Sequence, residues 1–149
     1  MVNNSNSMKI KYAVILVLGV IVVGAGIGLK MFFKPHADVN KLDAEFKMEA
    51  SRLMDEFQKE ENTATAKYSE KVLEISGKLV AKNKLPNGTN LLILEDEMAG
   101  ISCQLDSSWS AANPSVIQAL QTGNPVTVKG ICKGYLMEIK VSPAVVMTK

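Results

Sequence analysis

The sequence predicts a mainly β domain with helices, placed behind an N-terminal transmembrane helix. Three observations predict it: an uncharged apolar run near the N-terminus, a helical repeat of apolar residues after it, and alternating apolar and polar residues over the remainder. The predicted parts are a short polar and basic head at 1–11, a transmembrane anchor at 12–34, an amphipathic helix or linker at 35–67, and a β domain at 68–149.

The N-terminal run from Ala13 to Leu29 contains no charged residue and no proline. A bilayer core about 30 Å thick needs about 20 helical residues, which the predicted anchor supplies. A cleaved secretory signal would have a shorter apolar core and a polar region around its cleavage site. We therefore expect a retained single-pass anchor, which makes the membrane the first partner of this chain. The flanking lysines are Lys9, Lys11, Lys30 and Lys34.

The orientation of the anchor does not follow from these lysines, because their numbers on the two sides are balanced. Long downstream domains cross the membrane largely regardless of their charge, and the short polar head is easily left in the cytoplasm. We therefore expect the β domain to lie outside the cytoplasm, on the periplasmic side.

Positions 38–67 predict an amphipathic helix, because apolar residues recur mostly every three or four residues and charged residues fill most positions between them. The repeat is too short for the sustained heptads of a coiled-coil stalk. We expect its apolar face to pack on the neighbouring domain. The recurring apolar residues are Leu42, Phe46, Ala50, Leu53, Phe57, Ala64 and Tyr68.

From Leu73 onward the apolar period changes to two, which indicates strands with one buried face. A short helix interrupts the strands, with Asn113 as its N-cap, Pro114 at its first position and Gly123 at its end. The last strand is expected to end before Pro143. The predicted strands are Leu73–Lys82, Leu91–Glu95, Ile101–Asp106, Pro125–Tyr135 and Met137–Val141.

Three strands, a helix and two more strands form the order of the five-stranded OB barrel. Gly77 and Gly130 stand inside long predicted strands, where a small barrel must bend tightly. The predicted fold is therefore a transmembrane helix, an amphipathic helix, and then a five-stranded OB barrel with a helix between its third and fourth strands.

Blocks of residues in this order resemble the tRNA_anti-like family of OB-fold proteins. One block reads F-x3-E-x2-A-x2-KY-x2-KV-x2-I-x-G from Phe57, and a later one reads K-G-x-C-x-G-Y from Lys129. The resemblance spans about positions 53–147. It implies an OB fold and an anchored or lipid-modified envelope protein, and the nucleic-acid connotation of the family name comes from fold similarity. The matching residues are Phe57, Glu61, Ala64, Lys67, Tyr68, Lys71, Val72, Ile75, Gly77, Ser102, Cys103, Lys129, Gly130, Cys132, Gly134 and Tyr135.

Two features depart from the family pattern. Glu60 stands where the family commonly has asparagine, so no role of that asparagine carries over to this chain. A membrane helix takes the place of a lipobox, which changes only the anchoring device.

OB barrels bind their ligands on the face of the second and third strands and on the loops around it. Trp109 and Tyr135 are the aromatic residues of the barrel region that suit stacking on a base or a sugar, although Trp109 equally suits a plug inside the barrel. The candidate cationic residues are Lys82, Lys84, Lys129 and Lys133.

Cys103 and Cys132 both fall on inward strand positions. Inside a barrel, cysteine commonly acts as a small apolar filler. A disulfide would have to cross the barrel interior, since the fifth strand of an OB sheet lies between the third and the fourth. The residues leave a disulfide and two buried thiols as open alternatives.

The sequence offers little catalytic chemistry. His36 is the only histidine and lies outside the barrel, and no metal-ligand cluster or cofactor motif is present. We therefore expect a non-enzymatic binding module with no metal and no cofactor, whose partner is an envelope protein or another polymer. Nucleic acid is the alternative ligand, disfavoured by a net charge of only +2 and by Arg52 as the sole arginine.

Overall fold

The computed structural model describes residues 16, 17, 19 and 38–148. The chain divides into two compact units, Met1–Ala37 and Asp38–Lys149, and the second unit holds the whole β domain. The predicted head at 1–11 and nearly all of the predicted anchor at 12–34 lie outside the described residues. Among the residues that are described, no helix is long and apolar enough to cross a membrane.

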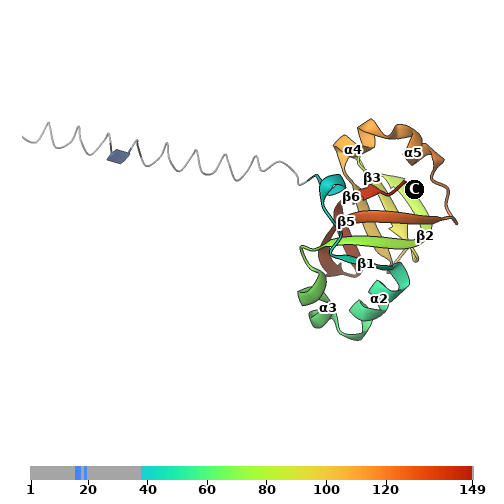
Figure 1. Cartoon of the computed structure of the whole chain (residues 1–149), viewed down its shortest axis with the longest axis horizontal. Helices are drawn as coiled ribbons and strands as arrows, with labels where there is room; N and C mark the ends of the chain where they lie inside the picture. The colour runs from blue at the N-terminus through green and yellow to red at the C-terminus, as the bar shows by residue number, and fades with distance from the viewer. Residues whose placement is uncertain (1–15, 18, 20–37, 149) are drawn as a thin grey trace, which may run out of the picture. The chain divides into compact units, whose positions relative to one another are not determined.

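Five strands of the second unit close into a barrel, which confirms the predicted β architecture (Figure 1). Their order around the barrel is β2, β3, β4, β6 and β5, and the ring closes because β5 also pairs with β2. All neighbours are antiparallel except β4 and β6. This is the strand order of an OB barrel. The strands are β2 Val72–Lys84, β3 Asn90–Leu94, β4 Ile101–Leu105, β5 Pro125–Leu136 and β6 Glu138–Val146.

The alternation along β2 places Leu73, Ile75 and Leu79 inside the barrel as predicted, whereas a shift in pairing between Leu79 and Ala81 turns Ala81 to the outer face beside Ile93. Leu73 and Ile75 are fully buried, whereas Lys78 is exposed. Gly77 marks a close approach, because a Cβ atom there would lie 2.6 Å from the Cβ of Ala50 and 2.9 Å from a carboxylate oxygen of Glu95. A side chain at this position would therefore push neighbouring segments away from the barrel wall.

The segment from 38 to 68 is not the single helix that the sequence predicted. Phe46 and Met48 are partly buried while Lys47 and Glu49 are exposed, so this stretch is a strand, and it pairs in parallel with β2. The helix prediction was wrong for this stretch because apolar residues spaced four apart also fit the two-residue period of a strand. The helix after it is broken at Glu60, whose φ of −147° is not helical. The elements are η1 Val39–Lys41, β1 Phe46–Glu49, α2 Ala50–Lys59 and α3 Glu61–Tyr68.

Helices cover both ends of the barrel, with α2 and α3 at one end and α4 and α5 at the other (Figure 1). Helix α5, Pro114–Ala119, begins where predicted but ends four residues before Gly123, because Leu120 is already extended. The preceding helix α4, Ser107–Ala112, was not predicted. Its N-cap is Asp106, whose carboxylate accepts a hydrogen bond of 2.8 Å from the Trp109 amide.

Strand β6 continues to Val146, well past the predicted end before Pro143. The pairing shifts here: Val141 lies opposite Cys132, and Ala144 lies opposite Gly130. Three residues of β6 thus span two of β5, which is a bulge. A bulge accommodates proline inside a strand, because the extra residue has no ladder hydrogen bond to donate.

The first residues of the unit are also packed on the barrel. Val39 in η1 is 2% exposed, and the Glu45 amide donates a hydrogen bond of 2.8 Å to the Val72 carbonyl. Leu53, Phe57 and other residues of this N-terminal part belong to the same buried cluster as the strands. The stretch predicted as a linker at 35–67 therefore contributes, from position 38 onward, to the domain core.

Candidate binding face

The outer face of β3 and β4 is the surface that OB barrels use for ligands. Leu92 and Leu94 belong to the core, so their neighbours Leu91 and Ile93 point outward. Cross-strand pairing adds Gln104 beside Leu91 and Ser102 beside Ile93. On this face Leu91 and Gln104 are partly exposed, whereas Ile93 and Ser102 are only 9% and 7% exposed.

This face is neutral and only moderately polar. Its centre carries aliphatic, hydroxyl and amide side chains, with Asn83 and Ala81 of β2 continuing it beyond Leu91 and Ile93. Two exposed lysines stand at its edges: Lys84 ends β2 beside Asn90, and Lys140 of β6 lies opposite Ser102. Its side chains suit hydrogen bonding and apolar contact with another chain better than the neutralisation of a row of phosphates.

Sequence reasoning did not single out Leu91, Ile93 and Gln104, and it named Ser102 only as a residue of the family pattern. The run from Leu91 to Leu94 is apolar throughout, so alternation alone does not say which residues face outward. The cross-strand register identifies them: Ile101 and Cys103, which are fully buried, lie opposite Leu94 and Leu92, so the residues between them face the other side of the sheet.

The two candidate aromatic residues lie at opposite ends of the barrel, and both pack against the core. Trp109 lies in α4, next to the partly buried apolar residues of α5. Tyr135 stacks on Phe57 of α2, with ring centroids 5.8 Å apart and an angle of 24° between the rings. The fold therefore does not bring them together into one stacking surface.

Two of the candidate lysines, Lys82 and Lys133, make hydrogen bonds or ion pairs with other groups at the surface of the domain. Lys82 donates hydrogen bonds of 3.1 Å to the carbonyls of Ile117 and Leu120 at the C-terminal end of α5. A cation is favourable at this end of a helix, where carbonyls lack helical partners. Lys133 pairs with the Glu70 carboxylate at 2.8 Å.

Lys129 is buried, with 7% of its surface exposed. It points outward from β5 as predicted, but the N-terminal segment covers it, and its ammonium donates to the carbonyls of Asn40 at 3.0 Å and Leu42 at 2.9 Å. Lys84 differs from the other three candidates, since no hydrogen bond or ion pair joins its ammonium to any residue in 38–148. Of the four lysines, Lys84 alone presents its ammonium to solvent without a protein partner in that range.

Both cysteines are buried free thiols. Cys103 of β4 and Cys132 of β5 each lie opposite Val141 of β6, on its two sides. Two strand spacings separate them by about 9–10 Å, beyond the limit of about 7 Å between the Cα atoms of a disulfide. Burial raises the pKa of Cys103 to about 12 and also raises the pKa of Cys132, so neither thiol is a ready nucleophile.

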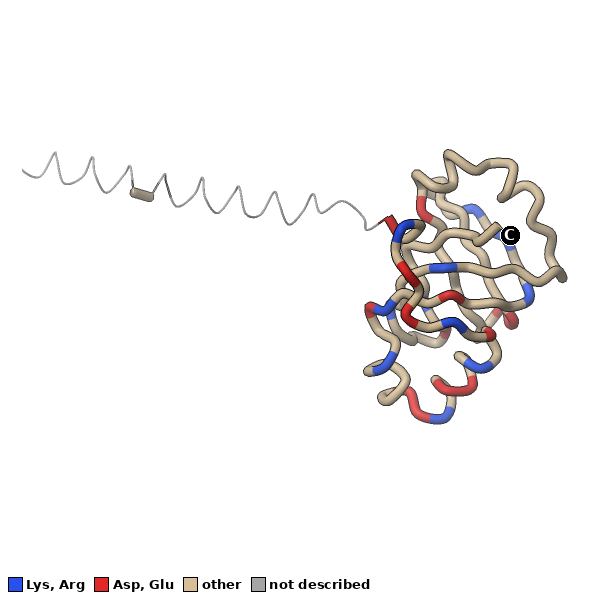
Figure 2. The backbone as a smooth tube through the Cα atoms, in the orientation of Figure 1, with Lys and Arg blue, Asp and Glu red and all other residues tan. Residues whose placement is uncertain are grey.

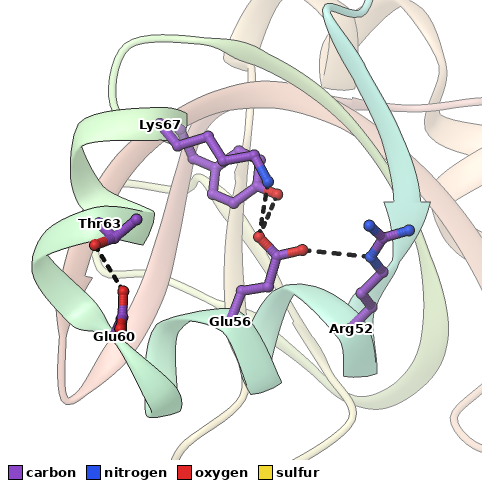
Figure 3. Close-up of polar contacts among 6 residues, drawn as sticks. Arg52, Glu56, Glu60, Thr63 and Lys67 are labelled. Carbon is purple, nitrogen blue, oxygen red and sulfur yellow. Dashed lines mark hydrogen bonds and ion pairs between the residues drawn. The ribbon is translucent and has the colours of Figure 1, made fainter.

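Lys67 and Tyr68 of the family's entry block take part in a polar network that joins α2 to α3 (Figure 3). The Glu56 carboxylate accepts hydrogen bonds from the Tyr68 hydroxyl at 2.7 Å, the Lys67 ammonium at 2.9 Å and the Arg52 guanidinium at 3.3 Å. The Tyr68 hydroxyl first, and then Lys67, hold the pKa of Glu56 below its usual range. Tyr68 also contacts Phe46 edge to face, with centroids 5.1 Å apart. These residues join two helices and a strand.

Comparison with known proteins gives one family and several similar solved structures. The tRNA_anti-like family model matches residues 8–143. A lipoprotein of Klebsiella pneumoniae proposed to bind nucleic acid has a TM-score of 0.53 at 16% identity, covering 77% of this chain and 100% of its own. An asparaginyl-tRNA synthetase of Entamoeba histolytica gives 0.40 at 14% identity, covering 54% of this chain and 21% of its own. Yeast Stn1 and Ten1 give 0.39 at 16% identity, covering 73% and 65%.

The curated proteins that were compared include no relative of this chain. The likeness to the Klebsiella lipoprotein establishes the fold, in agreement with the closed strand order described above. The family model reaches well beyond half of the sequence and includes every strand except the last residues of β6. The chain therefore belongs to the tRNA_anti-like family.

Proposed function

We propose that this chain is a membrane-tethered, non-enzymatic OB module that binds a protein or another polymer of the cell envelope through the outer face of β3 and β4. The main observation behind the proposal is that the aromatic and cationic side chains that a nucleic-acid site would need already make contacts within the domain. Trp109 and Tyr135 pack against the core, and the ammonium groups of Lys82, Lys129 and Lys133 are bonded to protein groups.

The neutral face of β3 and β4 suits a protein segment. Single-strand binding proteins combine several stacking aromatic residues with a cationic groove. Here the partly exposed side chains are Leu91 and Gln104, which provide apolar contact and an amide group, and Ile93 and Ser102 beside them are nearly buried. A non-enzymatic role is supported by the two thiols, whose burial withholds them from nucleophilic chemistry.

Tethering is supported by the predicted anchor at 12–34, which contains the uncharged apolar run from Ala13 to Leu29 and is long enough for a bilayer core. We place the domain on the periplasmic side, because a short polar head stays in the cytoplasm more easily than a long domain. A reporter enzyme that is active only outside the cytoplasm, fused after Lys149, should be active. A reporter active only inside the cytoplasm would reverse the assigned orientation.

Site-specific photo-crosslinking in cells tests the binding face. A photo-reactive residue replaces Gln104 at the centre of the face, and the matched control replaces Gln118, which is exposed on α5. We expect a discrete adduct from position 104 alone, removed by protease and resistant to nuclease. Adducts of equal yield from both positions would contradict a binding site on this face.

The second candidate function is nucleic acid binding, as proposed for the Klebsiella lipoprotein. Lys84 and Lys140, exposed at the edges of the face, are the residues that favour it. Fluorescence anisotropy of the full chain in nanodiscs with labelled single-stranded DNA and RNA decides between the two, with Lys84→Gln compared with Lys59→Gln on α2. We expect weak binding that is equal in both variants. Binding that falls steeply between about 50 and 200 mM salt and weakens only in Lys84→Gln would establish nucleic acid as the ligand.

A further inference from the structure

Three large apolar side chains of the domain remain mostly in solvent. Met98 in the turn between β3 and β4 is 87% exposed, and Leu136 and Met137 at the turn between β5 and β6 are 75% and 79% exposed. Large apolar residues exposed together are typical of interaction surfaces, whereas single ones are ordinary. We call these three residues the apolar tip.

The two turns lie at the same end of the barrel. Strands β4 and β6 are parallel neighbours, with Ile101 beside Ile139, so the turns that precede them meet at one edge. The Ile139 amide donates a hydrogen bond of 3.1 Å to the Gly100 carbonyl and fixes this alignment. The apolar tip is therefore composed of residues brought together by the barrel, although they are distant in sequence.

Met137 also has an unusual backbone conformation. Its φ is +66°, in the left-handed region that disfavours side chains with a Cβ atom. Two further non-glycine residues in 38–148 have positive φ, and both use their side chains within the domain: Glu70 pairs with Lys133 at 2.8 Å, and Glu95 accepts a hydrogen bond of 2.8 Å from the Lys78 amide. The Met137 side chain, in contrast, is left mostly in solvent.

Acidic residues flank the apolar tip in the sequence. The segments 95–99 and 136–138 contain four carboxylates, from Glu95, Asp96, Glu97 and Glu138, and no lysine or arginine. Asp96 accepts hydrogen bonds from the amides of Met98 at 2.8 Å and Ala99 at 2.9 Å, so its carboxylate is fixed beside the exposed methionine. Glu95 directs its carboxylate to the Lys78 amide of β2, so Asp96, Glu97 and Glu138 supply the negative charge beside the exposed side chains, and we call these three the acidic rim.

We propose that the apolar tip, with its acidic rim, docks a segment of a partner protein that combines apolar side chains with lysine or arginine. Negative charge repels both nucleic acid and the anionic surface of a bilayer, which leaves a basic and apolar protein segment as the complementary surface. The inference rests on the proposed function in that both expect a protein partner. It names a different surface from the face of β3 and β4, so either assignment can fail alone.

Methyl NMR tests the docking directly on the full chain in nanodiscs of zwitterionic lipid. The ε-methyl signals of Met98 and Met137 report on the apolar tip, and those of Met48 and Met147, which line other grooves, are internal controls. The probes are two synthetic peptides of the same amphipathic pattern, one of leucine and lysine and one of leucine and glutamate. We expect the leucine-lysine peptide alone to shift the Met98 and Met137 signals.

Charge and apolar variants complete the test. Glu97→Lys and Met137→Ser should each weaken binding of the leucine-lysine peptide by about fivefold or more, as truncation of an interface anchor does, whereas Gln104→Ala on the β3 and β4 face should leave it unchanged.

Equal shifts at all four methionines, or no shift, would overturn the proposal. Broadening of the Met98 and Met137 signals by spin-labelled lipid in the nanodisc would also overturn it, in favour of a lipid contact. An effect of Gln104→Ala equal to that of Met137→Ser would move the docking site to the proposed binding face.

Discussion

The two ends of the barrel are closed by helices in different ways. At one end, Leu53 and Phe57 of α2 and Tyr68 of α3 are at most 1% exposed and belong to the barrel core. At the other end, no residue of α4 or α5 is buried, and Trp109 and Val116 are only partly covered. A groove of about 590 Å³ lies beside α5, between this helix and the start of β5.

Charge follows the same division. The segment 107–124, which contains α4 and α5, carries no charged residue, whereas charged side chains of both signs are mixed along α2 and α3 (Figure 2). The Glu56 network joins α2 to α3 at the heavily packed end. The family's entry block, from Phe57 to Gly77, lies at this same end. The residues of this block therefore serve to pack the helices on the barrel, and the block does not indicate a ligand site.

The largest difference between the two ends should appear on truncation of their aromatic residues. Phe57→Ala removes a ring that is 1% exposed and stacked on Tyr135, so we expect a loss of about 3–5 kcal/mol in the free energy of unfolding. Trp109→Ala, at the partly covered end, should cost about half as much, because a partly exposed ring loses less contact. Urea denaturation of both variants measures the difference, and equal losses would remove the distinction between the two ends.

The second effect is the pH dependence of the cap formed by α2 and α3. Because the pKa of Glu56 is lowered in the folded state, its stabilising contribution is complete above the ordinary glutamate pKa of about 4.3 and is lost as the pH falls through the folded pKa. Glu56→Gln should therefore cost about 1–2 kcal/mol at neutral pH, and the difference from the native chain should shrink below pH 4.

The matched control for that experiment is Glu60→Gln. Glu60 is exposed, and its carboxylate accepts one hydrogen bond, from the Thr63 hydroxyl at 2.9 Å. Its replacement should change the free energy of unfolding little at any pH. A penalty for Glu56→Gln that persists unchanged in acid would show that the charge of Glu56 does not join the two helices.

The smallest effect should come from the lysine at the lightly packed end. Lys82→Met removes the hydrogen bonds to the carbonyls of Ile117 and Leu120, and we expect a loss below about 1 kcal/mol. The loss should be confined to α5, which hydrogen exchange followed residue by residue will reveal. Faster exchange throughout β2 in this variant would mean that α5 supports the barrel more than its burial indicates.

The strands were predictable where one face alternates and a turn follows, as in β2 with its apolar residues at every second position and Pro86 to Gly88 after it. Strand β1 was not predictable, because Phe46 fits both a helical and a strand period. The length of β6 was hidden by Pro143, which a bulge accommodates.

The candidate site was predictable only in part, because a side chain's partners come from distant segments. Strand parity placed Lys129 correctly on the outside of the barrel, yet Asn40, 89 residues earlier, covers it. Tyr135 likewise meets Phe57 only after the barrel has closed. A sequence pattern gives the face on which a residue lies, and tertiary packing decides whether that residue remains available to a ligand.

The central claim is that α2 and α3 are an integral wall of the domain core, whereas α4 and α5 form a lighter cover. Native-state hydrogen exchange on the full chain tests it most directly, because amides that open only in global unfolding share one exchange free energy. We predict that the amides of Leu53 and Phe57 exchange with the same free energy as those of β2, and that the amides of α5 exchange at a distinctly lower one. Exchange of Leu53 and Phe57 as fast as that of α5 would contradict the claim.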